Sequence, residues 1–195
     1  KLKIKNKKLT IKNYPDLVIY SPAVTENNPE LKAAKKLKIK TLSYPQALGI
    51  LTKKYYTIAV CGTHGKSTTT AMISLILIKA GLDPTVIIGT KLKEFSRNST
   101  KEGNNFRFGR SKYLVIEADE WKGSFLNYWP RIIVLTNIER EHLDYYKDLK
   151  HILKTYKKYI GHLPKEGVLA INRDDKNILK IAGRTAGLAT RQKAG

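Results

Sequence analysis

A short glycine-containing turn, GTHGKS at 62–67, constrains the fold of this chain more than any other feature. The apolar run at 56–61 before it is typical of a buried strand, and the residues from about Thr68 to Ala80 after it favour a helix that stops at Gly81. A glycine turn in this setting points several backbone N–H groups inward, beside the positive end of the helix. The sequence therefore predicts a phosphate-binding loop.

Two side chains of this loop add chemistry to the backbone. Lys66 is long enough to reach the β- and γ-phosphates of a nucleotide, and the Ser67 hydroxyl can ligate Mg²⁺. The usual pattern has glycine five positions before Gly65, where this chain has Val60. An incidental turn with an exposed lysine is the alternative, but the flanking strand and helix favour nucleotide binding. The expected nucleotide-binding residues of the loop are Gly62, Thr63, His64, Gly65, Lys66, Ser67 and Thr68.

Alternating strand and helix patterns predict an α/β fold: a mostly parallel sheet with helices on both faces. Further buried strands are expected at 16–20, 39–42, 86–88, 113–116, 132–135 and 168–171, and further helices at 28–37, from 45, and at 149–160. The polar segment at 90–111 is expected to be loop with edge strands. We expect residues 1–54 to be the remnant of a Rossmann-like domain and residues 55–183 to be an incomplete second domain.

One acidic and one imidazole side chain follow predicted strands that end at the edge of the sheet where the loop lies. Glu117 follows the strand at 113–116, and His142 comes shortly after the strand at 132–135. Ligands of parallel sheets bind at the carboxyl ends of the strands, where a carboxylate can hold the Mg²⁺ of a nucleoside triphosphate. A solvated loop acid is the alternative for Glu117. For His142 the residues alone favour a metal ligand and a solvated loop residue equally, because Mg²⁺ prefers oxygen ligands to imidazole nitrogen.

Composition narrows the classes of protein to which this chain can belong. An apolar content of 42% is too high for a disordered chain, and no apolar run approaches the length that spans a bilayer. The net charge of +21 is spread along the chain and comes mostly from lysine, so we expect a solvated surface and no nucleic-acid partner. Cys61 is the single cysteine, which rules out an intrachain disulfide and fits a reducing compartment.

Three motifs in order resemble the Mur ligases. They are GTHGKSTTT at 62–70, EADE at 117–120 with the Ser124-Phe125-Leu126 run and Pro130, and TNIEREHLDYY at 136–146; SPAVTENNPE at 21–30 is similar to the end of the family's UDP-binding domain. The resemblance covers roughly residues 14–181. The histidine of the loop and the TNIE-x-x-H-x-D run are most similar to the members that couple L-alanine to UDP-N-acetylmuramate.

The resemblance implies an ATP-dependent ligase of peptidoglycan precursor synthesis, located in the cytoplasm, that works through an acyl phosphate. It implies Lys66 as a phosphate ligand, Ser67 and Glu117 as Mg²⁺ ligands, His142 as ligand of a second Mg²⁺, and Asn137 as a further nucleotide-binding residue. The family's glycine-rich start and its C-terminal amino-acid domain have no counterpart here. We therefore expect this piece alone to be inactive in ligation, and residues 184–195 do not resemble the family. Cys61 stands where a small residue is common in the family, so we expect it to be a packed strand residue.

Two other functions remain open from the sequence. A related ligase that attaches a recycled murein tripeptide to the same sugar nucleotide shares the EADE and Asn-x-Glu-x-x-His features. A nucleotide-binding regulator without ligase activity would also explain the loop. The Trp121-Lys122-Gly123 run, which replaces the acidic and small residues usual after EADE, leaves the local substrate contacts undetermined.

Overall fold

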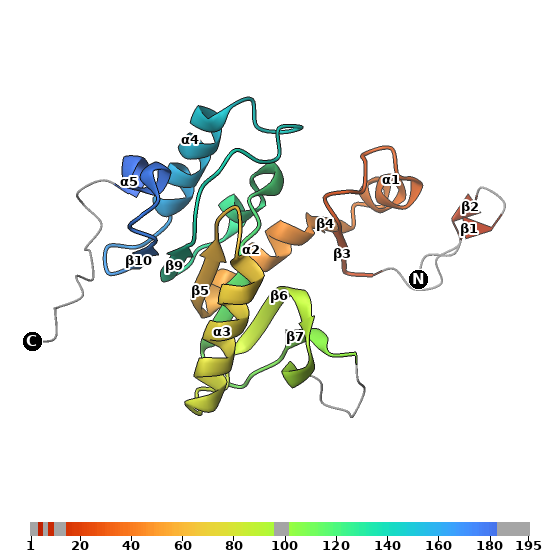
Figure 1. Ribbon diagram of the computed structural model, residues 1–195. Helices are drawn as coiled ribbons and strands as arrows, with labels where there is room; N and C mark the ends of the chain where they lie inside the picture. Colours follow the sequence, from red (N-terminus) through yellow and green to blue (C-terminus); the bar gives the residue numbers. More distant parts are fainter. Residues whose placement is uncertain (1–3, 6–7, 10–14, 96–101, 183–195) are drawn as a thin grey trace, which may run out of the picture. The chain divides into compact units, whose positions relative to one another are not determined.

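A computed structural model of the chain describes residues 4–5, 8–9, 15–95 and 102–182 (Figure 1). The chain divides into two compact units, 1–50 and 51–195, and each is described by itself. The expectation for residues 184–195 falls outside the described residues.

The first unit contains a parallel strand pair joined through a capped helix. Its elements are β1 (Ile4–Lys5), β2 (Lys8–Leu9), β3 (Leu17–Tyr20), α1 (Pro29–Lys36) and β4 (Lys40–Ser43). The Asn28 side chain accepts hydrogen bonds from the backbone N–H groups of Glu30 and Leu31, at 2.9 and 3.1 Å. A proline at the first helical position fits beside this cap, because that position needs no N–H donor. The expected helix start is confirmed.

The strand expected at 16–20 is present but is not buried. Leu17 and Ile19 are 40% and 51% exposed. Among the described residues β3 pairs with β4 alone, in parallel, so this two-stranded sheet leaves apolar side chains of β3 in contact with solvent. An apolar run shows that a segment can be buried, but whether it is buried depends on what packs against it.

The second unit is built on a six-stranded sheet with the order β10-β9-β5-β8-β6-β7. Its strands are β5 (Tyr56–Cys61), β6 (Thr85–Leu92), β7 (Asn104–Arg107), β8 (Tyr113–Glu117), β9 (Ile132–Leu135) and β10 (Val168–Ile171). The pairings are parallel except for the edge strand β7, which runs antiparallel to β6. The expected strands at 56–61, 113–116, 132–135 and 168–171 are confirmed, as is an edge strand within 90–111.

The remaining elements are α2 (Tyr44–Lys54), α3 (Lys66–Lys79), η1 (Lys93–Phe95), η2 (Trp121–Asn127), α4 (Leu149–Ile160) and α5 (Lys176–Ala182). The sequence patterns did not predict η2 or α5. Lys122 and Gly123 in η2 both have positive φ, a conformation that no periodicity signals. In the part of the chain that the structure describes, no helix has both the length and the apolar character needed to cross a membrane.

Helices cover both faces of the large sheet. Ile58 of β5 packs in a cluster with Val86, Val115 and the apolar side chains of α3. Because neighbouring strand residues point to opposite faces, Cys61 lies on the other face. There Tyr159 of α4 and Cys61 are both fully buried; burial raises the pKa of Tyr159 above its ordinary value, and the nearby Cys61 thiol adds to that rise. The mostly parallel sheet with helices on both faces is therefore confirmed, and Cys61 is a packed residue as expected.

Asp83 ties the start of β6 to the segment that enters β8. Its carboxylate accepts hydrogen bonds from Arg107 Nη2 at 2.6 Å and from the Arg110 backbone N–H at 2.8 Å. These hydrogen bonds, that of Arg110 first, lower the pKa of Asp83 below its ordinary value of 3.8. A lowered carboxyl pKa stabilises the fold above the unfolded value, and the contribution is lost as the pH falls through the folded value.

We therefore expect Asp83→Asn to lower the melting temperature at pH 6 and to have progressively less effect below pH 3.8. Asparagine tolerates the positive φ of 42° at this position, so backbone strain does not confound the comparison. Thermal melts of both proteins from pH 6 to pH 2.5 would measure this. A deficit that stays constant over the whole range would contradict the assignment.

Candidate functional site

The loop between β5 and α3 has a conformation that only glycine allows at its first position. Gly62 has a φ of 135°, and a Cβ there would lie 2.1 Å from Thr136 Oγ1. Gly65 has a φ of 77° and open space around it. The loop turns at these two residues, and α3 then begins at Lys66, two residues earlier than the sequence predicts. Lys66, Ser67 and the exposed Thr68 therefore lie in the first turn of α3.

The segment after β9 holds this loop in place. The Asn137 side chain accepts a hydrogen bond from the His64 backbone N–H at 2.8 Å and donates one to the His64 carbonyl at 3.0 Å. The Thr136 hydroxyl donates to the same carbonyl at 2.7 Å, and the Glu139 backbone N–H donates to Thr63 Oγ1 at 2.8 Å. The loop conformation is thus fixed by residues more than 70 positions away in the sequence. Asn137, expected to bind nucleotide, contacts the loop through its amide group.

We expect Asn137→Ala to weaken ATP binding about 10-fold and to lower the free energy of unfolding by about 1–3 kcal/mol, because two hydrogen bonds to the loop backbone are lost. Calorimetric titration with ATP and chemical denaturation would measure the two effects. Asn127→Ala is the matched control: its side chain also bonds a backbone carbonyl, that of Ser124. Equal losses of ATP binding in both variants would show that the hydrogen bonds between Asn137 and the His64 backbone have no specific role in ATP binding.

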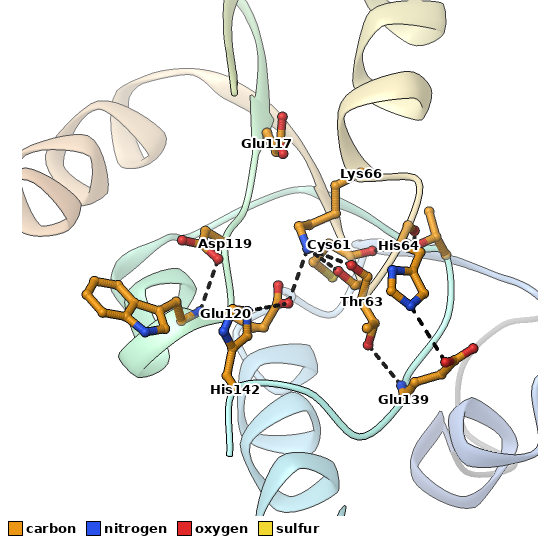
Figure 2. A network of polar contacts seen from close by, with 12 residues as sticks. Cys61, Thr63, His64, Lys66, Glu117, Asp119, Glu120, Glu139 and His142 are labelled. Carbon is orange, nitrogen blue, oxygen red and sulfur yellow. Dashed lines mark hydrogen bonds and ion pairs between the residues drawn. The ribbon is translucent and has the colours of Figure 1, made fainter. Parts of the chain in front are cut away.

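The Lys66 ammonium group lies over its own loop. Its Nζ donates to the carbonyls of Gly62 at 2.6 Å and Thr63 at 3.0 Å, and to Glu120 Oε1 at 3.1 Å (Figure 2). The side chain is 15% exposed, and that of Glu120 is 4% exposed. A positive charge is therefore held at the mouth of the glycine turn, where phosphate oxygens bind in loops of this kind.

Ser67 and Glu117 form a second contact beside the loop. The Ser67 hydroxyl donates to Glu117 Oε1 at 2.9 Å, and the Gly89 backbone N–H donates to Glu117 Oε2 at 2.7 Å. A Cβ on Gly89 would lie 3.0 Å from that oxygen, so glycine lets the strand approach the carboxylate closely. The structure thus brings together the two residues that the sequence proposes as ligands of one Mg²⁺.

His142 contacts Glu120, not Glu117. His142 Nε2 lies 3.5 Å from Glu120 Oε1, and the histidine backbone has a φ of 54°, which is uncommon for a residue with a side chain. The carbonyl of His142 accepts hydrogen bonds from the backbone N–H groups of Tyr145 and Tyr146, which hold this turn. Lys66, Glu120 and His142 therefore form one contact network at the carboxyl edge of the sheet (Figure 2).

Glu120 is the site residue that sequence reasoning missed. It belongs to the EADE run, but only its distance from the strand end was visible in the sequence. The turn after β8 directs it back under the loop, where the Tyr146 hydroxyl donates to its backbone carbonyl at 2.5 Å. Burial raises the pKa of the Glu120 carboxyl, and the neighbouring Lys66 charge opposes that rise. A second glutamate three residues after the strand-end Glu117 is the signal that could have drawn attention to it.

The possible metal-ligand atoms at this edge of the sheet form two groups. Ser67 Oγ and the Glu117 carboxylate are oxygen donors, which Mg²⁺ prefers. Asp119, Glu120 and His142 each offer one atom within 4.8 Å of the others, and they combine carboxylate oxygen with imidazole nitrogen. Among the described residues, buried Glu120 Oε2 has no hydrogen-bond partner. These residues fit one or two divalent cations.

Comparison with known proteins agrees with this arrangement. Residues 60–191 match the Mur ligase middle domain, and residues 3–56 match a second domain described as Mur ligase family, catalytic domain. A glycine loop between a central parallel strand and a helix, faced by strand-end acids, defines an α/β domain of the P-loop type. The chain belongs to the Mur ligase family.

Individual relatives refine the likeness. The chain is 47% identical over 167 residues to UDP-N-acetylmuramate–L-alanine ligase of Acetivibrio thermocellus, a match that covers 85% of this chain and 34% of the relative. It is 42% identical to the enzyme of the same name from Borreliella burgdorferi, with the same coverage. The chain spans about a third of the length of these curated relatives.

Two solved structures have a fold similar to that of this chain. UDP-N-acetylmuramate:L-alanyl-gamma-D-glutamyl-meso-diaminopimelate ligase from Neisseria meningitides matches with a TM-score of 0.76 and 27% identity, over 88% of this chain and 56% of that one. UDP-N-acetylmuramate-alanine ligase from Thermotoga maritima matches with a TM-score of 0.69 and 29% identity, over 85% and 37%.

Proposed function

We propose that this chain is the nucleotide-binding part of an ATP-dependent ligase that joins L-alanine to the carboxylate of UDP-N-acetylmuramate. The observation that carries the proposal is the Lys66 ammonium group, held over the glycine turn 3.1 Å from Glu120 Oε1, with the Ser67–Glu117 pair beside it. The two curated relatives described above, at 47% and 42% identity, are named for this reaction.

The chemistry of amide formation requires an activated carboxyl group. A carboxylate is a poor electrophile, so one of its oxygens first attacks the γ-phosphorus of ATP, which releases ADP and leaves an acyl phosphate. The amine then attacks the acyl carbon, and inorganic phosphate leaves. Lys66 would contact the phosphoryl oxygens, whose charge must be offset as the bond to ADP breaks. The loop N–H groups and the α3 N-terminus would hold the phosphate chain.

Mg²⁺ is part of the proposal because its ligands fit. Ser67 and Glu117 would hold one ion, and His142 would lie at a second. A bound Mg²⁺ neutralises charge on the phosphoryl oxygens. In this chain Gly89 orients the Glu117 carboxylate through its N–H, so that Oε1 faces Ser67. The location of the protein in the cytoplasm remains a prediction.

The related tripeptide ligase is the second candidate. The structural match from Neisseria meningitides is named for a tripeptide-type substrate and has the higher TM-score of the two structures. The higher sequence identity to the L-alanine ligases favours L-alanine as the acceptor.

The test has two parts. Calorimetric titration of this chain with ATP and Mg²⁺, with and without UDP-N-acetylmuramate, separates a ligase from a regulator, since a regulator would bind ATP identically in both. ADP release by the complete enzyme that contains this chain is then compared with L-alanine and with tripeptide as acceptor. We expect L-alanine to be used. Failure of the chain to bind ATP would refute the proposal, and use of tripeptide alone would replace it with the second candidate.

A further inference from the structure

We propose that a pocket at the amino edge of the large sheet binds a small anion with two or more phosphate groups, at a position separate from the glycine loop. This amino-edge pocket has a volume of about 510 Å³, which is in the range of small-molecule sites. It is lined by basic and aromatic side chains, among them Lys53, Lys54, Lys112, Trp129, Arg131 and His162. The inference does not depend on the proposed ligase activity.

The first step is the position of the pocket. Tyr56 begins β5 and lines the pocket, whereas the glycine turn follows Cys61 at the other end of that strand. β5 is six residues long, so at about 3.3 Å per residue its ends lie roughly 17 Å apart. Strands β8 and β9 run parallel to β5, so Lys112 and Arg131, which directly precede them, lie at the same edge as Tyr56. A ligand in this pocket would therefore leave the nucleotide loop free.

The second step is the charge. The lining side chains include no acid but four cations, Lys53, Lys54, Lys112 and Arg131, and all four are exposed. Within the described part of the chain, none of the four forms an ion pair. A phosphate group carries about −1.5 to −2 charges near pH 7, and a carboxylate carries a single one. A compact diphosphate therefore offsets these cations in less space than a run of acidic side chains needs.

The third step is that contacts inside the protein form the wall of the pocket. The Trp129 backbone N–H donates to the buried Thr52 Oγ1 at 3.0 Å. The His162 ring stacks on the Trp129 ring, with centroids 4.5 Å apart, and its Nδ1 lies 3.0 Å from the Tyr128 carbonyl oxygen, to which it must donate. Lys53 Nζ lies 4.7 Å from the Trp129 ring centroid. Protein groups thus already contact the indole, which favours a compact anion over a ligand that stacks a base on it.

The experiment titrates this chain with inorganic pyrophosphate, without Mg²⁺, and follows tryptophan fluorescence. The chain has two tryptophans, so a Trp121→Phe background leaves Trp129 as the single reporter. Pyrophosphate in the pocket would draw the Lys53 ammonium group away from the indole and change its emission. We expect a saturable response.

Single substitutions test which residues hold the anion. Arg131→Ala and Lys112→Ala should each weaken pyrophosphate binding by about 5-fold or more, because each removes a charged donor. Both side chains are exposed, so the fold should persist in both variants. Lys150→Ala, at an exposed lysine in the first turn of α4, is the matched control and should change the affinity by less than about twofold, since salt screens distant charges.

Three results would overturn the proposal. Equal weakening by Lys150→Ala and by the pocket variants would show that the net charge of +21 attracts pyrophosphate without a site. Loss of the Trp129 response in the double variant Lys66→Ala with Glu120→Gln, which lacks the loop lysine and its buried partner, would place the pyrophosphate at the loop. A response to hexaglutamate but not to pyrophosphate would identify an acidic polypeptide as the ligand.

The same question is then asked of the complete enzyme that contains this chain. Calorimetric titration with pyrophosphate, with and without Arg131→Ala, should again show weaker binding in the variant. Identical titrations would show that the rest of the protein fills the amino-edge pocket, and would overturn the proposal for the whole molecule.

Discussion

Lys66→Ala is expected to weaken ATP binding by this chain at least about 100-fold, and to lower turnover of the complete enzyme by about 1000-fold or more. The ammonium group is the cation held over the glycine turn, so its removal leaves the phosphate oxygens without their charged partner. Removal also leaves Glu120 as a buried acid without its ion-pair partner, which costs about 3 kcal/mol of stability. Calorimetric titration with ATP measures the first effect, and thermal denaturation measures the last.

A double variant separates these two consequences. Lys66→Ala with Glu120→Gln removes both charges, so much of the lost stability should return while ATP binding stays weak. Lys91→Ala, at a 63% exposed lysine paired with Glu102, is the control for a simple loss of positive charge. ATP affinity in Lys66→Ala within threefold of that in Lys91→Ala would remove Lys66 from the nucleotide site.

Gly62→Ala is expected to abolish detectable ATP binding and to lower the free energy of unfolding by about 3 kcal/mol. The added Cβ would meet Thr136 Oγ1 at 2.1 Å and the backbone of Asn137 at 2.9 Å, at a φ of 135°. The loop and the segment that braces it must therefore separate. Chemical denaturation and ATP titration measure the two effects.

Gly65→Ala is the matched control three positions along the same loop. Its φ of 77° is also positive, but a Cβ there has nothing within 4 Å. We expect about 1–2 kcal/mol of backbone strain and partial retention of ATP binding. If the two alanine variants behave alike, glycine is needed in this loop only for its backbone freedom, and the close approach to Thr136 has no separate role.

Much of the site could be located from the sequence because its parts are local. The glycine turn, the helix after it and Glu117 at a strand end each depend on a few neighbouring residues. The strands at 56–61 and 132–135 were found with their observed bounds, since a parallel strand covered on both faces by helices is a nearly continuous apolar run. The short helix α5 was missed although Asp175 caps it, by accepting hydrogen bonds from the Asn177 and Ile178 backbone N–H groups.

The sequence alone determined that this chain is an α/β protein with a phosphate-type loop, because periodicity and glycine placement are properties of short segments. Which acid contacts which partner depends on tertiary packing that no short segment shows. Glu117 faces Ser67, while Glu120 lies under the loop between Lys66 and His142. These partners depend on the turn after β8, whose backbone conformation no sequence periodicity signals. They also depend on the burial of the Glu120 carboxylate by residues far away in the chain.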